Sequence, residues 1–341
     1  MGYNTLRSIF ERIPRLSLVQ ELDKQGLRDL LKRAGVRNVD EISTNIKTQA
    51  AHNLDTAYKD LDRFSDQNIE LITKRDPRFP ERMKELKDCP PWLFVQGQPG
   101  LLQRPDFVAV VGTRTPTEPG VRTAIELSTW LSERGFPIVS GLAEGIDAAA
   151  HQTSLDFGAP NVAVLGNGIW VVFPASTSHL RRRIVEEGGA VITEFLPNES
   201  YQRERFVKRN RLQAALAFAI CPVEGAAQSG TSHTLRFAEE LHRIIFGVRS
   251  KALRDGPMQT LLANRKHPVF DLSSATDLRK LDDLLAPHLQ EPAASATGDL
   301  PRLFVSTIRE FERVVNSYEV SDEQVDKLIA TLRQSWEKRQ S

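Results

Sequence analysis

The stretch FVAVVGTRTPTEPG, residues 107–120, carries an apolar run that stops at Gly112 and is followed by a turn rich in threonine and proline. A turn at the end of a buried strand is a usual place for a ligand in an α/β protein. Neither the GxGxxG of a dinucleotide fold nor the lysine of a phosphate loop is present. A phosphate bound here would be held by backbone amides, Thr113 and Arg114, whose guanidinium can donate to two phosphate oxygens at once.

The segment SGLAEGIDAAAHQTSL, residues 140–155, combines a serine and two glycines with the start of a helix. Gly141 and Gly145 permit a tight turn and a close approach of the backbone to a ligand, and the first N–H groups of the helix form an anion site. Asp147 fits a helix cap as well as a pocket wall. Taken alone, the segment is explained equally well by ligand binding and by tight-turn architecture.

The segment YQRERFVKRNRLQAALA, residues 201–217, holds five basic residues and one acidic residue, a local net charge of +4. At helical spacing its apolar residues turn inward, which leaves many of the basic groups along one edge. An isolated charge run is most often a solvated face. This run enters a helix beside the same sheet edge as Arg114, which favours phosphate binding. Tyr201 and Phe206 are its only aromatic residues, so electrostatic contacts are expected to outweigh base stacking.

The segment VEGAAQSGTSHTLRFAEE, residues 223–240, places Ser229, Gly230, Thr231 and Thr234 ahead of or at the start of another helix. Hydroxyl groups and backbone N–H groups at a helix start form a phosphate cradle without any lysine. One such turn is a weak indication. Several turns that converge on one sheet edge, with a basic helix among them, are a strong one.

Two glutamates also lie where strands are expected to end. Glu194 closes AVITE, residues 190–194, and Glu224 lies near the end of AFAICPVEG, residues 217–225. A carboxylate in such a place can bind a ribose hydroxyl or act as a base, and it can equally cap a helix or form a salt bridge. We therefore take Glu194, Glu224 and Asp147 as candidate polar residues of the expected pocket.

These segments need a parallel sheet to bring them together. Between residues 106 and 248, continuous apolar strands alternate with helical patterns, which is typical of a parallel sheet covered by helices on both faces. Strands are predicted at 69–73, 92–97, 107–112, 137–141, 162–166, 190–194, 217–225 and 244–248, and helices at 119–134, 145–157, 204–217 and 231–242. Because ligands bind beyond the carboxyl ends of such strands, the segments above are expected at one edge.

Four parts are predicted along the chain. They are an N-terminal helical region (1–68), an α/β domain with a mixed-edge parallel sheet (69–285), a linker (286–301) and C-terminal helices without a clear winged helix (302–341). In the first part, one helix is expected to stop at Gly35 and a second to run from about Asn45 to Phe64. The apolar stripe of the last helix is expected to pack on the body or on a partner subunit.

The composition limits the classes of function. With a net charge of +1 on 341 residues, any nucleic-acid partner must be held by a local patch. Cys89 and Cys221 cannot form a disulfide framework or a four-ligand zinc site. Neither a signal-peptide core nor a membrane-spanning apolar run is seen, so a cytoplasmic protein with no membrane partner is expected. Zinc-helix spacing and the Gly-x-Ser-x-Gly turn are also absent, and we expect no metal, no cofactor and no catalytic residue.

The order of the motifs resembles the DNA-processing protein A family, also termed Smf/DprA. The matching motifs are GTR (112–114), SGLAEGIDAAAH (140–151), VLGNGIWVVFP (164–174), TEF (193–195), KRNR (208–211), VEGAAQSGT (223–231) and IIFGV (244–248). A lead-in at 76–97 and a weaker tail at 256–278 extend the resemblance to about residues 60–285.

The resemblance implies an extended Rossmann-like fold, a pocket for single-stranded DNA, a homodimer formed through the same domain, and loading of the RecA recombinase without an enzymatic step. The DNA-binding residues carried over by position are Gly112, Arg114, Ser140, Gly141, Gly145, Lys208, Arg209, Asn210 and Arg211, with Ser229, Gly230 and Thr231 added from the last turn and Thr113 from the first.

The chain also departs from the family pattern. Arg249-Ser250 stands where members usually have Pro-Gly, and Gly256-Pro257-Met258 stands where they show a Gly-Ser-Asn-like turn. The tail is too short and too helical for a winged helix, and the N-terminal region lacks helix-hairpin-helix glycines. Natural transformation, repair and a defence role therefore stay open.

Two other functions could use the same kind of pocket. The sheet also resembles nucleoside-monophosphate phosphoribohydrolases, which place Gly-Gly-x-Gly-Thr where this chain has Gln-Ser-Gly-Thr at 228–231. Glu194, Glu224 and Arg211 would then serve glycosidic cleavage, although the absent doubled glycine disfavours it. The other alternative is a sensor that binds a nucleotide signal and acts through the C-terminal helices.

Overall fold

The computed structural model describes residues 22–33, 35–36, 38–48, 59–226, 229–253 and 255–289. The predicted C-terminal helices at 302–341 and most of the predicted linker lie outside the described residues. Within the described part of the chain, no helix is long and apolar enough to cross a membrane.

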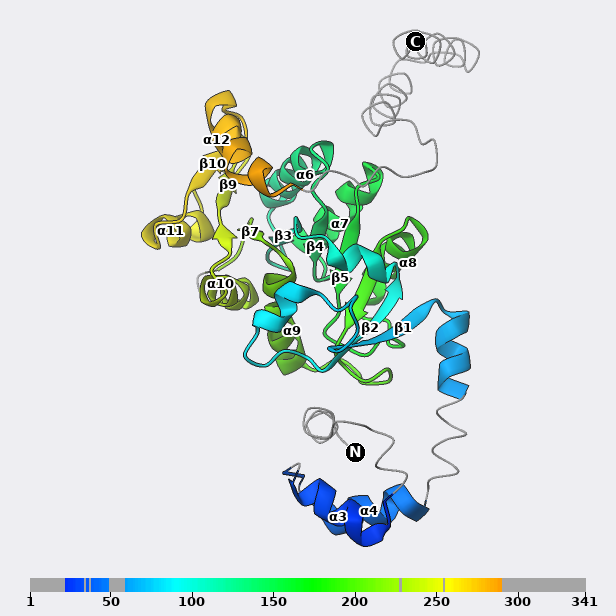
Figure 1. Cartoon of the computed structure of the whole chain (residues 1–341). Helices are drawn as coiled ribbons and strands as arrows, with labels where there is room; N and C mark the ends of the chain where they lie inside the picture. The colour runs from blue at the N-terminus through cyan, green and yellow to red at the C-terminus, as the bar shows by residue number, and fades with distance from the viewer. Residues whose placement is uncertain are drawn as a thin grey trace, which may run out of the picture. The chain divides into compact units, whose positions relative to one another are not determined.

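An eight-stranded sheet, in the order β1-β2-β6-β5-β4-β3-β7-β8, forms the centre of the main domain (Figure 1). Its strands are β1 (Ile69–Thr73), β2 (Trp92–Gly97), β3 (Val108–Val111), β4 (Ile138–Ser140), β5 (Asn161–Val164), β6 (Ala190–Thr193), β7 (Ala219–Pro222) and β8 (Ile244–Ile245). The strands from β3 onward pair in parallel, whereas β2 pairs antiparallel with both β1 and β6. The predicted parallel sheet with a mixed edge is confirmed.

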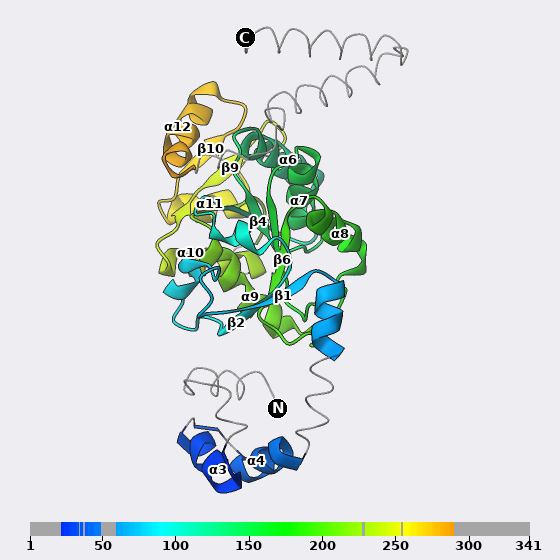
Figure 2. The ribbon, with the colours of Figure 1, turned by 45° about the vertical axis from the view of Figure 1, so that its right-hand side comes forward.

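Helices cover both faces of this sheet (Figure 2). One face carries α6 (Glu118–Glu133), α7 (Ile146–Asp156) and α8 (Ser178–Glu186), and the other carries α9 (Arg203–Leu216) and α10 (Gly230–Glu240). Successive strand residues point to opposite faces. In β3, Val108 and Val110 therefore belong to the core under α6 and α7, whereas Ala109 and Val111 belong to the core under α9 and α10. The apolar runs of the sequence are continuous because each strand is buried on both sides.

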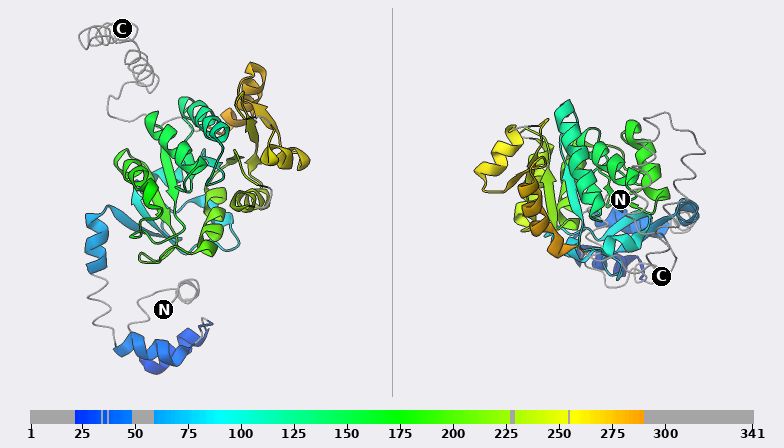
Figure 3. Two further views of the ribbon diagram at one scale, coloured as in Figure 1. Left: turned by 180° about the vertical axis from the view of Figure 1, so that it is seen from behind. Right: turned by 90° about the horizontal axis from the view of Figure 1, so that it is seen from above.

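Smaller elements extend the fold at the two edges of the sheet (Figure 3). Beyond β8 lie β9 (Gly247–Arg249) and β10 (Val269–Asp271), which pair in parallel, together with α11 (Pro257–Asn264) and α12 (Ala275–Leu285). At the other edge, a helix at 59–66 leads into β1. The Phe64 ring of this helix stacks on Trp170, with the two centroids 4.9 Å apart.

The segment 244–248, predicted as one strand, is divided between the two sheets. The N–H of Phe246 still donates to β7, whereas the N–H of Gly247 donates to Pro268, next to β10. A Cβ atom at Gly247 would lie 2.6 Å from the side chain of Leu262. The glycine therefore lets the chain pass close to α11 as it leaves the main sheet.

The N-terminal region also differs in part from its prediction. The first helix, α3 (Lys24–Arg33), stops as expected before Gly35, which has a left-handed φ of 67°. The next helix is α4 (Val39–Thr48), which begins before the predicted start at Asn45. Asp40 and Glu41 occupy its first turn, where acidic side chains favour a helix start through the helix dipole. Residues 49–58 lie outside the described part of the chain.

Candidate nucleic-acid interface

The parallel strands divide at β3, which has β4 on one side and β7 on the other. The chain runs from β3 through β4, β5 and β6 toward one edge and then returns to β7 and β8 on the far side of β3. Such a reversal leaves a crevice beyond the carboxyl ends of the strands, where ligands of this architecture bind. A cavity of about 620 Å³ opens there, lined by the turn after β3, the first turns of α7 and α10, and one side of α9.

The cavity brings together many of the residues that the sequence predicted for the site. Those on its wall are Gly112, Thr113, Arg114, Asp147, Arg209, Asn210, Ser229, Gly230 and Thr231. The structure places the others away from the wall: Ser140, Gly141, Gly145, Glu194, Lys208, Arg211 and Glu224. Segments more than 100 residues apart in sequence thus meet at one edge of the sheet.

Two arginines of the cavity wall are open to solvent. Arg114 and Arg203 are both exposed, and neither forms an ion pair with another described residue. Arg205, which follows Arg203 closely in sequence, is instead paired with Glu199 at 2.8 Å. Arg114 and Arg203 therefore remain available for an anionic ligand.

Arg209 supplies a third positive charge from within the wall. Its side chain is 3% exposed, and its Nη1 donates to the carbonyl oxygen of Val164 at 2.5 Å. Burial lowers the pKa of Arg209 to about 10; the carboxylate of Asp147 opposes this shift, and the positive charge of Arg114 adds to it. Arg209 stays protonated at neutral pH, so the cavity keeps a fixed cation behind its surface.

Asp147 and Ser140 order the turn after β4 and join its start to β3. The Asp147 carboxylate accepts the N–H of Gly141 at 3.1 Å, and burial raises the pKa of this carboxyl while Arg209 opposes the shift. The Ser140 hydroxyl donates to the carbonyl oxygen of Val110 at 2.6 Å. Ser140 and Gly141 therefore position the wall from behind, whereas Asp147 also lines the cavity.

The start of α10 forms another part of the cavity wall. The N–H of Ser229 donates to the Ser232 hydroxyl at 3.0 Å, and the side-chain amide of Asn210 donates to the carbonyl oxygen of Gly230 at 3.1 Å. The first N–H groups of an α-helix have no acceptor within the helix. Gly230 and Thr231, the first residues of α10, line the cavity, so the positive end of the helix dipole lies at its wall and favours a bound anion.

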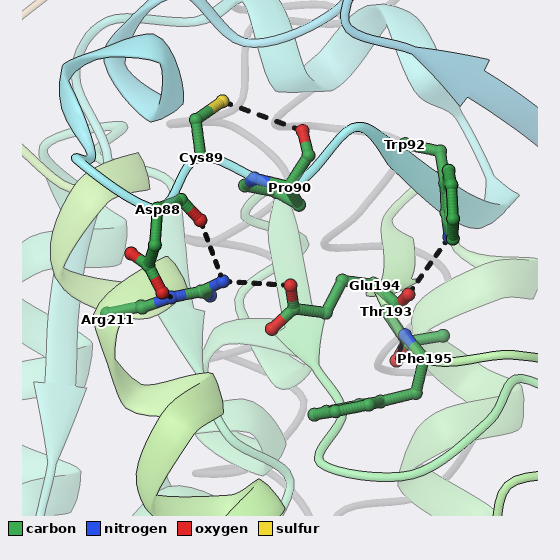
Figure 4. A network of polar contacts seen from close by, with 8 residues as sticks. All are labelled: Asp88, Cys89, Pro90, Trp92, Thr193, Glu194, Phe195 and Arg211. Carbon is green, nitrogen blue, oxygen red and sulfur yellow. Dashed lines mark hydrogen bonds and ion pairs between the residues drawn. The ribbon is translucent and has the colours of Figure 1, made fainter. Parts of the chain in front are cut away.

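Arg211, predicted to contact DNA, lies in a buried network on the opposite side of α9 (Figure 4). Its Nη2 pairs with Glu194 Oε2 at 2.8 Å and its Nε pairs with Asp88 at 2.6 Å. Residues two positions apart on a helix point about 200° apart, so Arg209 and Arg211 cannot both face the cavity. The predicted places of Arg211 and Glu194 in the pocket are corrected: both lie beneath the segment that precedes β2.

Two further predicted residues also lie off the wall. The Glu224 carboxylate accepts the N–H of Thr117 at 3.1 Å and its hydroxyl at 3.2 Å, so it fastens the start of α6. Its backbone carbonyl accepts the N–H of Thr113 at 2.8 Å. Lys208 is half-buried and does not reach the cavity.

Three residues that line the cavity are not among the predicted site residues: Tyr201, Arg203 and His233 of α10. In the sequence, Arg203 stands out only as part of the charge run and Tyr201 only as one of two aromatic residues beside it. The ring of Phe173, from the loop after β5, lies against that of Tyr201, with the centroids 4.3 Å apart and the planes tilted by 36°. No signal in the sequence relates Phe173 to Tyr201, because their contact depends on how two distant loops fold together.

The architecture agrees with comparisons to known proteins. A sequence profile of the family described as DNA recombination-mediator protein A matches residues 70–266, more than half of the chain. The chain belongs to this family. The resemblance predicted from the order of the motifs is thereby confirmed.

Relatives of known sequence also match the chain. The chain is 34% identical over 201 residues to protein Smf of Synechocystis sp., a match that covers 56% of this chain and 48% of Smf. It is 34% identical over 269 residues to a DNA processing protein DprA of Mycobacterium tuberculosis, which covers 75% of this chain and 66% of that protein. The matches thus span between about half and two thirds of the length of these relatives.

Two solved structures share the fold. DNA processing protein A of Streptococcus pneumoniae superposes with a TM-score of 0.61 at 26% identity, covering 82% of this chain and 93% of that one. DNA processing protein A of Helicobacter pylori, described with a single-stranded DNA binding mode, superposes with a TM-score of 0.56 at 23% identity, covering 64% and 97%. The Rossmann-like fold predicted for the main domain is therefore confirmed.

Proposed function

We propose that the chain is a DprA-like single-stranded DNA-binding protein that acts as a recombination mediator in DNA uptake, recombination or a related defence role. One observation carries the proposal: Arg114 and Arg203, without ion-pair partners among the described residues, share a cavity with the start of α10. Membership of the recombination-mediator family supports it, as does the single-stranded DNA binding described for the Helicobacter pylori relative.

Phosphates of the strand would be the groups that the cavity holds. The guanidinium of Arg114 can grip two phosphate oxygens, and the N–H groups at the start of α10 can donate to a third. Arg209 adds positive potential from the cavity wall, where its Nη1 already donates to the carbonyl oxygen of Val164. Contacts of this kind carry no base information, so binding should depend strongly on salt and weakly on sequence.

Binding without catalysis is part of the proposal. A hydrolase would need a free carboxylate at the cavity, yet Glu194 and Glu224 both lie off the wall and are engaged by Arg211 and Thr117. Asp147 is at the wall but accepts hydrogen bonds from its own turn. Among the described residues, no group of three metal-binding side chains lies together.

The partners are proposed on the same basis. The protein would act in the cytoplasm as a homodimer, protect single strands and load a RecA recombinase onto them, as the family resemblance implies. Dimerisation and RecA loading would use surfaces outside the cavity, so substitutions at the cavity should weaken strand binding without dissociating the dimer.

Fluorescence anisotropy with a labelled dT strand, repeated across salt concentrations, tests the proposal. Arg114→Gln and Arg203→Gln are expected to weaken binding and to reduce the slope of log K against log salt by about 0.7 for each phosphate that the variant no longer neutralises. Arg182→Gln is the matched control, because Arg182 is 71% exposed on α8 and does not line the cavity. Its slope should equal that of the wild type.

Competition with nucleoside monophosphates separates the alternatives. Monophosphates should barely displace the strand if several phosphates bind together. Tight capture or cleavage of a monophosphate, with no strand binding, would instead identify a sensor or a phosphoribohydrolase. If the salt slopes of strand binding are equal for the wild type, Arg114→Gln and Arg203→Gln, the cavity is not part of the DNA interface.

A further inference from the structure

The loop between β6 and α9 carries Arg203 to the cavity, yet little of this loop is buried. All residues from 198 to 204 are exposed except Glu199. α9 begins at Arg203, and the residue before it, Gln202, makes no capping hydrogen bond with its side chain. Apart from the ring contacts of Tyr201, the stretch therefore depends on polar contacts for its position.

Glu199 supplies such contacts from its side chain and its backbone. Its Oε2 accepts the N–H of Leu196 at 3.0 Å, and its Oε1 pairs with Nη2 of Arg205 at 2.8 Å. Its backbone N–H donates to the carbonyl oxygen of Leu196 at 2.9 Å, and its carbonyl oxygen accepts the N–H of Gly168 at 2.8 Å. Glu199 thus joins α9 both to its own loop and to the loop after β5.

Arg205 closes the loop from the other end. Its Nη1 donates to the carbonyl oxygen of Ser200 at 2.8 Å, and its guanidinium carbon lies 5.4 Å from the ring centroid of Phe195. We term the ion pair of Glu199 and Arg205 the loop clasp. The two side chains of the loop clasp are 20% and 19% exposed, and salt screens a partly buried pair less than an exposed one. Arg203 lies between them in sequence and lines the cavity.

We infer that Glu199 is a positioning residue, which through the loop clasp holds Arg203 where its guanidinium binds a phosphate of the strand. The inference rests on the proposed function and deepens it. A negative charge near a phosphate site ordinarily weakens the binding of nucleic acid, because like charges repel. Glu199 has the opposite effect, since the position of Arg203 depends on it. The sign of the change in affinity when this charge is removed therefore tests the inference.

Glu199→Gln removes the charge and keeps the size of the side chain. Anisotropy with a labelled dT strand, repeated across salt concentrations, measures its effect. The variant is expected to bind roughly 10-fold more weakly than the wild type, about the loss of one hydrogen bond to a charged group. The slope of log K against log salt should fall by about 0.7, because one phosphate contact is lost. A residue that only stabilises the fold would leave this slope unchanged.

Two further variants separate the loop clasp from general electrostatics. Glu204→Gln removes the same charge from the first turn of α9, where Glu204 is exposed, does not line the cavity and forms no ion pair with another described residue. It should bind the dT strand at least as tightly as the wild type. Arg205→Gln breaks the loop clasp from its other side and should reproduce the loss seen in Glu199→Gln.

The Arg203→Gln background shows whether the effect passes through Arg203. In this background Glu199→Gln should cause no further decrease in the salt slope, because the contact that it disturbs is already absent. The affinity of this double variant should be equal to or above that of Arg203→Gln, since only the repulsion by Glu199 remains to be removed. Circular dichroism of each variant confirms that the helices are retained.

The outcomes distinguish the positioning role from the function on which it rests. If Glu199→Gln binds the dT strand as tightly as the wild type or more tightly, the positioning role is overturned, and a reduced slope in Arg203→Gln keeps the phosphate site. Additive decreases of the slope in the double variant, or an equal loss of affinity in Glu204→Gln, also overturn it. An unchanged slope in Arg203→Gln does the same, and a reduced slope in Arg114→Gln then keeps the proposed function. If the wild type does not bind the strand, the proposed function and the positioning role both fail.

Discussion

Arg211 and Glu194 form an ion pair of 2.8 Å in which the two side chains are only 2% and 0% exposed. Asp88 pairs with the same guanidinium from the segment before β2. Charges taken out of water persist only where they are paired and hydrogen-bonded. The network therefore fastens α9, whose other side presents Arg209 and Asn210 to the cavity, to the sheet and to the segment above it.

Removal of Arg211 should harm the fold more than the phosphate contacts. We expect Arg211→Met to lower the free energy of unfolding by about 3–5 kcal/mol, because Glu194 is left as a buried charge without its partner. The salt slope of DNA binding by the folded protein should stay that of the wild type, since Arg211 does not face the cavity. Urea unfolding followed by circular dichroism measures the first quantity, and anisotropy measures the second.

The control for this prediction is Arg236→Met. Arg236 is 57% exposed on α10 and pairs with Glu240 only at 3.6 Å, so its removal should change stability by less than about 0.5 kcal/mol. Glu194→Gln in the Arg211→Met background should restore part of the stability. If Arg211→Met is as stable as the wild type and its salt slope of DNA binding is reduced by about 0.7, Arg211 contacts a DNA phosphate and the prediction is wrong.

Gly145 should tolerate no side chain. Its φ is 80°, and a Cβ atom there would lie 2.5 Å from the carbonyl oxygen of Thr113 and 2.8 Å from that of Arg114. We expect Gly145→Ala to lower the free energy of unfolding by more than about 1 kcal/mol. It should also weaken binding of the dT strand, because the clash displaces the turn that carries Arg114.

Gly230 provides the matched comparison for stability. A Cβ atom at Gly230 meets no other atom within 4 Å, and its φ is not positive. Gly230→Ala should therefore change the free energy of unfolding by no more than about 0.5 kcal/mol. Thermal and urea unfolding of both variants test the difference, and equal decreases in stability would show that the turn around Gly145 is not the source of the strain.

The sheet and the position of the site could be predicted because local patterns determine both. Strands buried on two faces need continuous apolar runs. Each run stops at a glycine, such as Gly112, or at a polar residue, and this stop marks the carboxyl edge of the sheet. The break between β8 and β9 could not be predicted in this way. It depends on the close approach of Gly247 to Leu262, which is not adjacent to it in sequence.

The roles within the basic helix were only partly predictable. The charge run identifies α9 as a candidate, but net charge does not tell which side of a helix meets the cavity. Arg209 and Arg211 look alike in the sequence, although helical geometry points them in different directions. The carboxylates that capture Arg211 come from Asp88 and Glu194, and the pairing exists only once the chain has folded.

Acid should destabilise the protein through His151, which is completely buried in α7. Its Nδ1 lies 2.5 Å from the Asn161 side-chain oxygen, and its Nε2 has no hydrogen-bond partner in the described structure. Burial lowers the pKa of His151 to about 4 from an ordinary value of 6.5. Between pH 6.5 and pH 4, His151 binds a proton in the unfolded chain but stays neutral in the folded one. The free energy of unfolding therefore falls as the pH falls through this range.

The decrease in stability attributable to His151 should reach about 3 kcal/mol between about pH 7 and pH 4. Urea unfolding at a series of pH values measures it as the difference between the wild type and His151→Gln, which cannot titrate there. The variant should be less stable than the wild type at neutral pH, because the fitted ring is gone, but its stability should fall less steeply toward acid. Parallel pH profiles for the two proteins would mean that His151 takes up its proton within the fold, which would require an acceptor at Nε2 and a rearranged turn between α7 and β5.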